Sequence, residues 1–271
     1  MSNIRPASHQ SQWYPDNQSN ALKNQLSKYY KLQADPNLKF LIAPHAGLTY
    51  CVETQGAVFS KVDINQYQMV IILGVCHGFR CNGLKQSPFT TWEDPLGGTP
   101  LPIYKSKFDQ VNSRDDVQEH SIELLVPFIS LILGDNRKIP ILPLYCGIDP
   151  STKDIDYLKQ LQQQNKALIV ISSDFSHFGG RFDYAPKMGN MTALQVVDYV
   201  NQEAVKGIQS SAEAFKNSLE ETQNTVCGRY TIYTGLSIFD NYEAELLSYT
   251  KSSVPKDFKD SCVCYCGIIG K

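Results

Sequence analysis

The sequence lacks the features that direct a protein to nucleic acid or to a membrane. Its 271 residues carry 25 Lys and Arg against 27 Asp and Glu, with no long block of one sign, so the basic footprint of a nucleic-acid binder is absent. The longest apolar stretches, such as residues 69–76, are too short to span a bilayer. The first residues contain no apolar core of a secretion signal. We therefore expect a cytoplasmic protein with no nucleic-acid partner and no membrane span.

Cysteine is also scarce for a disulfide scaffold, with eight residues in the whole chain. A reduced compartment is the simpler interpretation. Three of the eight, Cys262, Cys264 and Cys266, alternate along an expected strand and therefore face one side of it. Without other cysteines or histidines nearby in the sequence, this pattern favours buried apolar packing over a metal site.

What the chain does contain is enough apolar material for a sizeable core, with 42% hydrophobic residues. Short aliphatic runs typical of buried strands alternate with segments of helical spacing. Strands are expected at 39–43, 69–75, 139–145, 167–172 and 262–269. Helices are expected at 20–32, 52–62, 119–133, 154–164, 191–208 and 229–239. Residues 84–102 indicate a long loop or hairpin. The alternation predicts an α/β sandwich, and the absence of a linker or repeat predicts a single domain over residues 1–271.

Three of the five histidines occupy equivalent positions, just after expected strands. His45 follows the strand at 39–43, His77 follows that at 69–75, and His177 follows that at 167–172. In open α/β sheets, ligands bind at the carboxyl ends of the strands. If these strands are parallel neighbours, the three imidazoles converge on one site.

Imidazoles combined with one anionic group bind Fe, Cu or Zn. Asp174, the carboxylates of residues 119–123 and the thiol of Cys227 are the candidates for that group. Cys227 precedes an expected helix and lies beside Arg229, so we expect its pKa to be lowered. The alternative is structural: the histidines and Asp174 cap turns, and the acidic residues at 119–123 begin a helix.

Several motifs occur in one order along the chain and resemble the Memo family (mediator of ErbB2-driven cell motility). They are ASH at 7–9 with WY at 13–14, IAPHAG at 42–47, EHSIE at 119–123, SSDFSHFG at 172–179 and CGR at 227–229. The resemblance runs from about residue 5 to the C-terminus. It implies a single three-layer α/β/α domain with a mixed or mostly parallel sheet, similar to the class III extradiol dioxygenases of the LigB type.

The resemblance also implies a metal pocket. It assigns His45, His77 and Cys227 as ligands of iron or copper, with His177 and Asp174 as catalytic groups beside them. Cys227 occupies the place of the carboxylate ligand of the dioxygenases, so the site is expected to be vestigial and without ring cleavage. The sequence departs from the animal pattern at Cys76, before His77, where Pro-Ser-His-His is expected, and at Tyr230, where a histidine is expected.

Three functions remain open from the sequence. The first is a redox-active metal protein, acting in redox chemistry or in signalling linked to cell motility. The second is a non-catalytic module in which the same pocket binds a phosphotyrosine-containing peptide or a signalling receptor, with Trp13, Tyr14 and Arg181 as contacts; arginine suits phosphate. The third is an active non-haem iron dioxygenase or a metal hydrolase.

Overall fold

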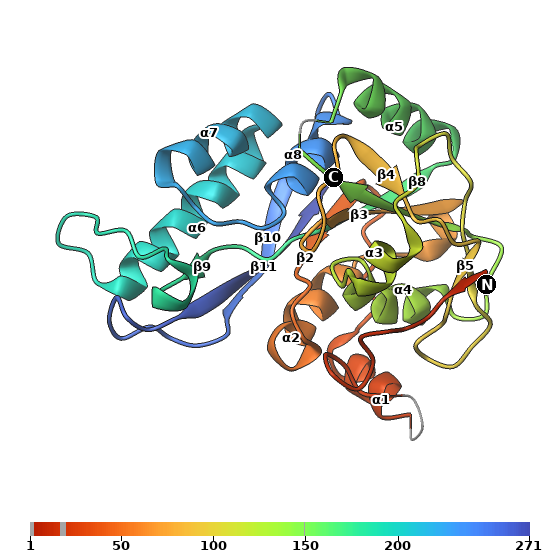
Figure 1. Cartoon of the computed structure of the whole chain (residues 1–271), viewed down its shortest axis with the longest axis horizontal. Coiled ribbons are helices and arrows are strands. Elements are labelled where there is room, and N and C mark those ends of the chain that lie inside the picture. Colours follow the sequence, from red (N-terminus) through yellow and green to blue (C-terminus); the bar gives the residue numbers. More distant parts are fainter. Residues whose placement is uncertain (1–2, 17–19, 149) are drawn as a thin grey trace.

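A mixed β-sheet runs through the centre of the molecule (Figure 1). The computed structural model describes residues 3–16, 20–148 and 150–271. Within them, eight strands form this sheet, in the order β10-β11-β2-β8-β3-β7-β4 with the short β9 paired to β11. The strands are β2 (Phe40–Ala43), β3 (Met69–Val75), β4 (Leu84–Gln86), β7 (Ile141–Cys146), β8 (Ala167–Ser172), β9 (His177–Phe178), β10 (Ala244–Lys251) and β11 (Cys262–Gly270). The central β2, β8, β3 and β7 are parallel, whereas β4, β10 and β11 pair antiparallel at the flanks.

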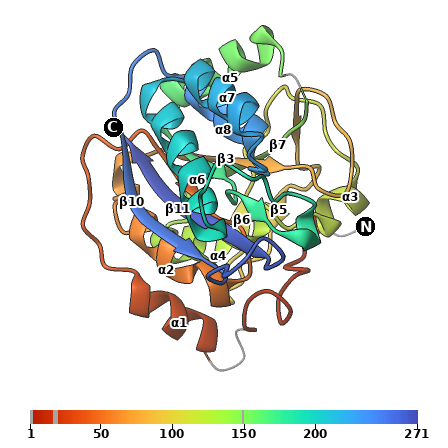
Figure 2. The same ribbon diagram turned by 90° about the vertical axis from the view of Figure 1, so that its left-hand side faces the viewer.

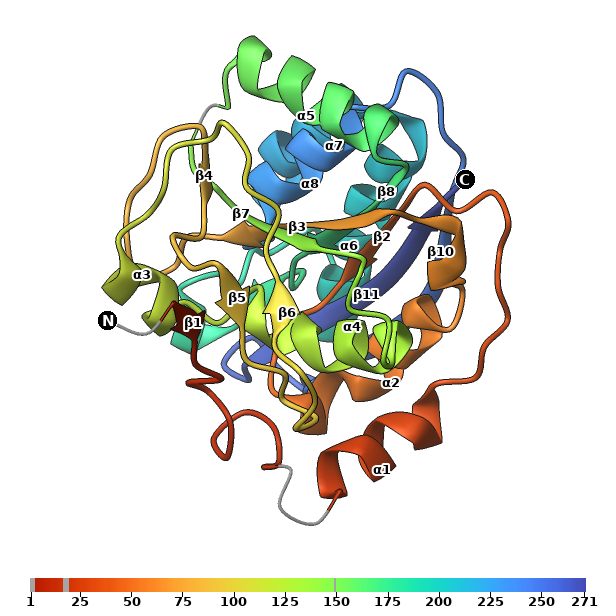
Figure 3. The same ribbon diagram turned by 90° about the vertical axis from the view of Figure 1, so that its right-hand side faces the viewer.

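Helices cover both faces of the sheet and give three layers (Figures 1 and 3). One face carries α1 (Ala21–Tyr29), α2 (Leu48–Phe59) and α4 (Val126–Leu133). The other carries α5 (Thr152–Gln164), α6 (Ala193–Ser210), α7 (Ala212–Thr222) and α8 (Arg229–Ser237), and Figure 2 shows α6 lying across β10 and β11. Alternate residues of β8 enter the two apolar cores: Ile169 and Ile171 face α5–α8, and Leu168 and Val170 face α2 and α4. Burial on both sides explains the continuous aliphatic runs of these strands.

A short N-terminal segment is fastened to one side of this sandwich (Figure 3). Its strand β1 (Ile4–Arg5) joins β5 (Thr91–Trp92) and β6 (Leu101–Pro102) in a small second sheet, near the short helix α3 (Ser113–Gln118). Arg5 is only 1% exposed, donates to the carboxylates of Asp116 and Glu123, and lies over the ring of Trp92. A buried cation is tolerated because it is paired and hydrogen-bonded.

The predicted α/β/α architecture is confirmed, with differences at the edges. The five expected strands are present to within two residues at each end. The segment predicted as a loop or hairpin contains β4 and the antiparallel pair β5 and β6. Helix α2 begins at Leu48, earlier than expected, and residues 119–133 contain a 3-10 turn (Glu123–Leu125) before α4. The strand β10 and helix α7 were not predicted; β10 is an edge strand whose residues are mostly half-buried.

The three alternating cysteines of β11 are buried in the core on the α5–α8 side, as predicted. No helix within the described parts of the chain is both long and apolar enough to cross a bilayer.

Candidate metal centre

The carboxyl ends of three neighbouring parallel strands bring histidines to one edge of the sheet. His45 follows β2, His77 follows β3, and His177 follows β8, the strand between them. The ring centroids of His45 and His77 are 5.1 Å apart. Cys227 joins them from the loop before α8, with its Sγ 3.3 Å from Nε2 of His45. The donor atoms of His45, His77 and Cys227 all lie within 4.8 Å of one another. Of the three imidazoles predicted to converge, those of His45 and His77 therefore lie in one donor cluster, and the thiol of Cys227 completes it.

Hydrogen bonds determine which nitrogen of His45 is free. Its Nδ1 lies 2.7 Å from Oγ of Ser172. The Ser172 hydroxyl donates its single proton to the carbonyl of Ser121, so it accepts from His45, and Nδ1 carries the ring proton. The lone pair is then on Nε2, which faces Cys227. Burial and the neighbouring histidines hold the pKa of His45 well below its usual range, so the ring is neutral and able to bind a metal.

His77 is oriented by a buried carboxylate in the same way. Its Nδ1 lies 2.9 Å from Oε1 of Glu119, and its backbone N–H donates to Oε2. Burial alone would raise the pKa of Glu119, but the hydrogen bond and charge of His77 and donors from the following residues lower it to about 2. The ionised Glu119 only accepts hydrogen bonds, so Nδ1 of His77 donates to it and Nε2 is the ring nitrogen left for a metal. A carboxylate behind a histidine is a common support of metal-binding imidazoles.

His177 lies at the same edge but outside this three-donor cluster. Its Nδ1 is 3.0 Å from the carbonyl of Phe175 and 3.3 Å from that of Thr225. Carbonyls only accept, so Nδ1 is protonated and Nε2 is a free proton acceptor. Burial lowers the pKa of His177, which keeps the ring neutral. The ring packs edge-on against Phe182.

The expected lowering of the Cys227 pKa is wrong. Removal from water raises the pKa of this thiol, and the nearby Asp174 carboxyl adds to the effect. The guanidinium of Arg229 donates to the carbonyls of Val226 and Asn224, and burial outweighs any effect of its charge on the thiol. A cation bound at the site would supply the missing positive charge. The turn itself requires Gly228: a Cβ there would lie 2.4 Å from the side chain of Ser173.

Asp174 supports the turn that carries His45. Its carboxylate Oδ1 accepts the backbone N–H of His45 at 2.8 Å, and its backbone N–H points to Sγ of Cys227 at 3.3 Å. Burial raises the pKa of Asp174 to about 7, despite the backbone donors that oppose the shift. A carboxyl that titrates near neutrality, on a residue in hydrogen-bond contact with both His45 and Cys227, is able to hold or release a proton at this edge.

The sequence analysis did not identify His120 as part of the site. Its ring stacks on His77 at 4.7 Å and on Trp13 at 4.7 Å, and its Nδ1 lies 3.5 Å from Glu119. His77, Glu119 and His120 form a second overlapping group of donors. Burial and the neighbouring histidine rings lower the pKa of His120 to about 4, in spite of Glu119. The EHSIE motif at residues 119–123 could have indicated it. Its carboxylates were considered as an anionic ligand or as the start of a helix, but its histidine was not considered as a metal ligand.

The residues proposed as peptide contacts lie in different environments. Trp13 is 38% exposed above His120, whereas Tyr14 is buried and donates its hydroxyl to Glu123. Arg181 is exposed on the turn that carries Phe182. His9 is partly buried, with Nδ1 2.9 Å from Glu123. The carboxylate of Glu123 thus fastens the N-terminal segment beside the histidines.

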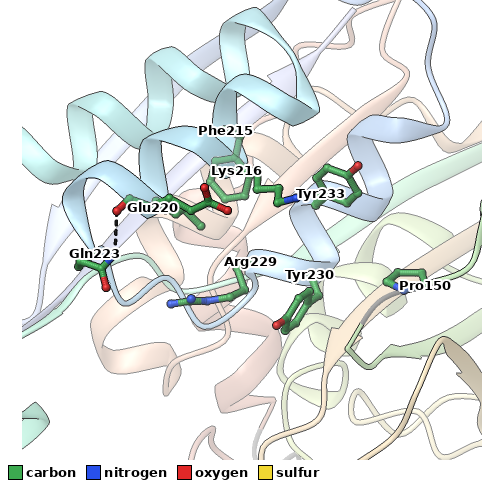
Figure 4. Close-up of a pocket in the computed structure, with 9 residues that line it drawn as sticks. Pro150, Phe215, Lys216, Glu220, Gln223, Arg229, Tyr230 and Tyr233 are labelled. Carbon is green, nitrogen blue, oxygen red and sulfur yellow. Dashed lines mark hydrogen bonds between the residues drawn. The ribbon is translucent and has the colours of Figure 1, made fainter.

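Two cavities flank the loop that carries Cys227. One, of about 470 Å³, is lined by Cys227 and by Cys76, Cys81 and Cys146. The other, of about 380 Å³, lies beyond Arg229 and Tyr230, which line both (Figure 4). Four cysteines therefore line the cavity of about 470 Å³.

The fold and the site together define an α/β protein with a histidine and cysteine cluster at the carboxyl edge of a parallel β core. Comparison with known proteins identifies the family. The sequence matches the family model described as Memo-like protein over residues 5–269. The chain belongs to the Memo family.

Relatives match along nearly the whole chain. It is 31% identical to the Protein memo-1 homolog of Caenorhabditis elegans, covering 96% of this chain and 81% of that protein. It is 28% identical to a MEMO1 family protein of Schizosaccharomyces pombe, with 97% of each covered, and 27% identical to Protein MEMO1 of Homo sapiens, covering 96% and 95%. A solved structure of an uncharacterized Escherichia coli K12 protein aligns with a TM-score of 0.46 and 11% identity, over 84% of this chain and 99% of that one.

Proposed function

We propose that this Memo-family chain, acting as one domain, binds iron or copper through His45, His77 and Cys227 and acts in redox chemistry. The observation that supports this most directly is the donor set: one ring nitrogen from each of two histidines and one thiol sulfur, within 4.8 Å of one another. A hydrogen bond at Nδ1 already orients each imidazole: the partner is Ser172 for His45 and Glu119 for His77. Such support lowers the cost of ordering the ligands when a metal binds.

The sulfur donor favours copper over iron. Soft thiolate ligands select Cu(I), and imidazole suits Cu, Fe and Zn alike. Because the pKa of Cys227 is raised in the free protein, binding must displace the thiol proton, and affinity depends on pH. The bound metal would supply one-electron chemistry with oxygen. The chain's own residues would hold its ligands, and the free Nε2 of His177 and the carboxyl of Asp174 would take up or release protons beside them.

We do not expect ring cleavage of catechols. The related dioxygenases use two histidines and a carboxylate and leave adjacent positions for substrate and O₂. Here Cys227 occupies the third place, and a thiolate is itself open to oxidation. Wild-type protein loaded with Fe(II) anaerobically should give no ring-opened product from a panel of catechols. Turnover at ordinary enzyme rates, about 1 s⁻¹ or more, would contradict this part of the proposal, and a gain of activity only in Cys227→Glu would support it.

Metal titration of the purified, tag-free protein tests the central claim. Cu(I) is measured against a competing chelator, and Fe(II) is measured anaerobically, for the wild type and for His45→Ala, His77→Ala and Cys227→Ser. We expect each substitution to weaken binding, with Cys227→Ser weakening Cu(I) more than Fe(II), since the soft ligand matters most to the soft ion. Cys266→Ala, a buried thiol of β11, is the matched control. Equal affinities for all variants would refute the site.

A second function has one specific observation in its favour, the exposed Trp13 above His120. In it the same pocket would bind a phosphotyrosine peptide without chemistry, with Trp13 and the exposed Arg181 as contacts and with Tyr14 as support from the core. Calorimetric titration with a phosphotyrosine peptide and its unphosphorylated form tests this. Binding of the phosphorylated form alone, lost in Arg181→Ala, would favour it; equal or absent binding would exclude it.

The cellular setting is proposed on the family resemblance. We infer a cytoplasmic protein whose role is in redox or signalling linked to cell motility, with a signalling receptor as a partner. Co-purification from a cytoplasmic extract with and without phosphatase treatment tests that partner, and a partner retained after treatment would contradict recognition of phosphotyrosine.

A further inference from the structure

Two cysteines outside the proposed ligand set lie in direct contact. The Sγ atoms of Cys76 and Cys81 are 2.9 Å apart. Cys76 immediately precedes His77, and Cys81 ends the same exposed loop. Neither thiol has a place in the proposed metal chemistry.

Both thiols are held by backbone that the sheet fixes. Cys76 follows the last residue of β3, Val75, which is in register with Cys146 of β7. The carbonyl of Cys81 accepts the N–H of Ile148, just beyond the end of β7. Gly147 permits this approach, because a Cβ there would lie 1.9 Å from that carbonyl oxygen. The two sulfurs therefore lie in contact because β3 and β7 are neighbours. Only a small movement of the two side chains is needed to form a disulfide bond between them.

The pair is also accessible. Cys76 and Cys81 are partly exposed and line the cavity of about 470 Å³ beside Cys227. The other cysteines, Cys227 apart, are buried. The pKa of Cys81 is lowered through its hydrogen bond with Cys76, assisted by the charge of Lys85, which favours the thiolate that reacts with oxidants.

We propose that Cys76 and Cys81 form a peroxide-oxidised thiol pair that closes to a disulfide around the loop carrying His77. The Cys81 thiolate attacks one oxygen of hydrogen peroxide, the O–O bond breaks, and the departing hydroxide takes up a proton to leave as water. The sulfenic acid formed on Cys81 is attacked by the Cys76 sulfur, the S–S bond forms, and a second water leaves with the Cys76 proton. Two thiols are oxidised by two electrons, and one peroxide is reduced to two waters.

Peptide mapping tests this directly, because Arg80 separates the two cysteines. Trypsin places Cys76 in the peptide of residues 62–80 and Cys81 in that of residues 81–85. The full-length protein is treated with hydrogen peroxide in the presence of a chelator, alkylated, denatured and digested without reductant. We expect the two peptides to be joined in a species that reductant separates. The chelator makes the result independent of the proposed metal function.

Variants identify the reacting atoms. Cys76→Ser should lose the joined peptides and leave a sulfenic acid at Cys81 that dimedone traps, whereas Cys81→Ser should lose both. Cys146→Ala is the matched control and should keep the joined peptides, because Cys76 contacts the backbone carbonyl of Cys146 and alanine retains it. If wild-type peptides 62–80 and 81–85 remain separate while other thiols are oxidised, or if Cys76 is joined instead to the Cys227 peptide of residues 217–229, the proposal is wrong.

Discussion

Replacing Glu123 with glutamine tests whether one buried carboxylate fastens the N-terminal segment beside the histidines. Glu123 accepts from Arg5 at 2.6 Å, from Nδ1 of His9 at 2.9 Å and from Tyr14 at 2.9 Å. Burial alone would raise its pKa, but the hydrogen bond from His9 and the charge of Arg5 lower it from 4.5 to about 2. Each tenfold change in proton affinity corresponds to about 1.4 kcal/mol. The ionised form therefore stabilises the fold by about 3 kcal/mol at neutral pH.

The pH dependence has a definite sign. A carboxyl whose pKa is lowered on folding contributes its full stabilisation above its unfolded pKa of 4.5, and this is lost as the pH falls toward 2. Glu123→Gln should lose about 3 kcal/mol of unfolding free energy at pH 7, and its difference from wild type should shrink below pH 4.5. Urea unfolding at a series of pH values measures both, with Trp92, which lies against Arg5, as a fluorescent reporter.

The control is Glu93→Gln, an exposed carboxylate that accepts the backbone N–H of Ala7 in the same segment. As a surface substitution it should change the unfolding free energy by less than about 0.5 kcal/mol. The reasoning is refuted if Glu123→Gln is as stable as Glu93→Gln at pH 7, or if its deficit grows as the pH is lowered.

Three further predictions concern the metal centre. Glu119→Gln should weaken Cu(I) or Fe(II) binding by about ten- to a hundredfold, because it replaces the anionic two-oxygen acceptor that orients His77 with a neutral amide; metal titration measures this, with Glu93→Gln unchanged. Gly228→Ala should cost about 1–3 kcal/mol of unfolding free energy, since its Cβ would overlap the side chain of Ser173; urea unfolding checks it, and unchanged stability would contradict the tight turn. Cu(I) affinity should rise by about tenfold per pH unit above pH 7 because Cys227 releases its proton on binding, and a flat profile would contradict the thiolate ligand.

The sequence by itself determined the parallel core and the positions of three histidines. Continuous aliphatic runs such as residues 69–75 and 167–172 are a local signal, because a strand buried on both faces needs apolar side chains at every position. A histidine just after such a run must lie at the carboxyl edge, whatever the rest of the fold. The edge strand β10 lacked that signal, since its residues are mostly half-buried and do not need apolar side chains at every position.

Only the tertiary structure decided what surrounds those histidines. Cys227 reaches His45 across 182 residues of sequence, and His120 stacks both on His77 and on Trp13 of the N-terminal segment. The pKa of Cys227 was predicted to fall but is raised. Neighbours along the chain indicate which charges lie nearby but not how deeply the thiol is buried, and burial has the largest effect on its pKa. Contact between Cys76 and Cys81 likewise depends on Gly147 of the adjacent strand end. Burial and through-space contact are properties of packing between distant segments, so local sequence patterns do not determine them.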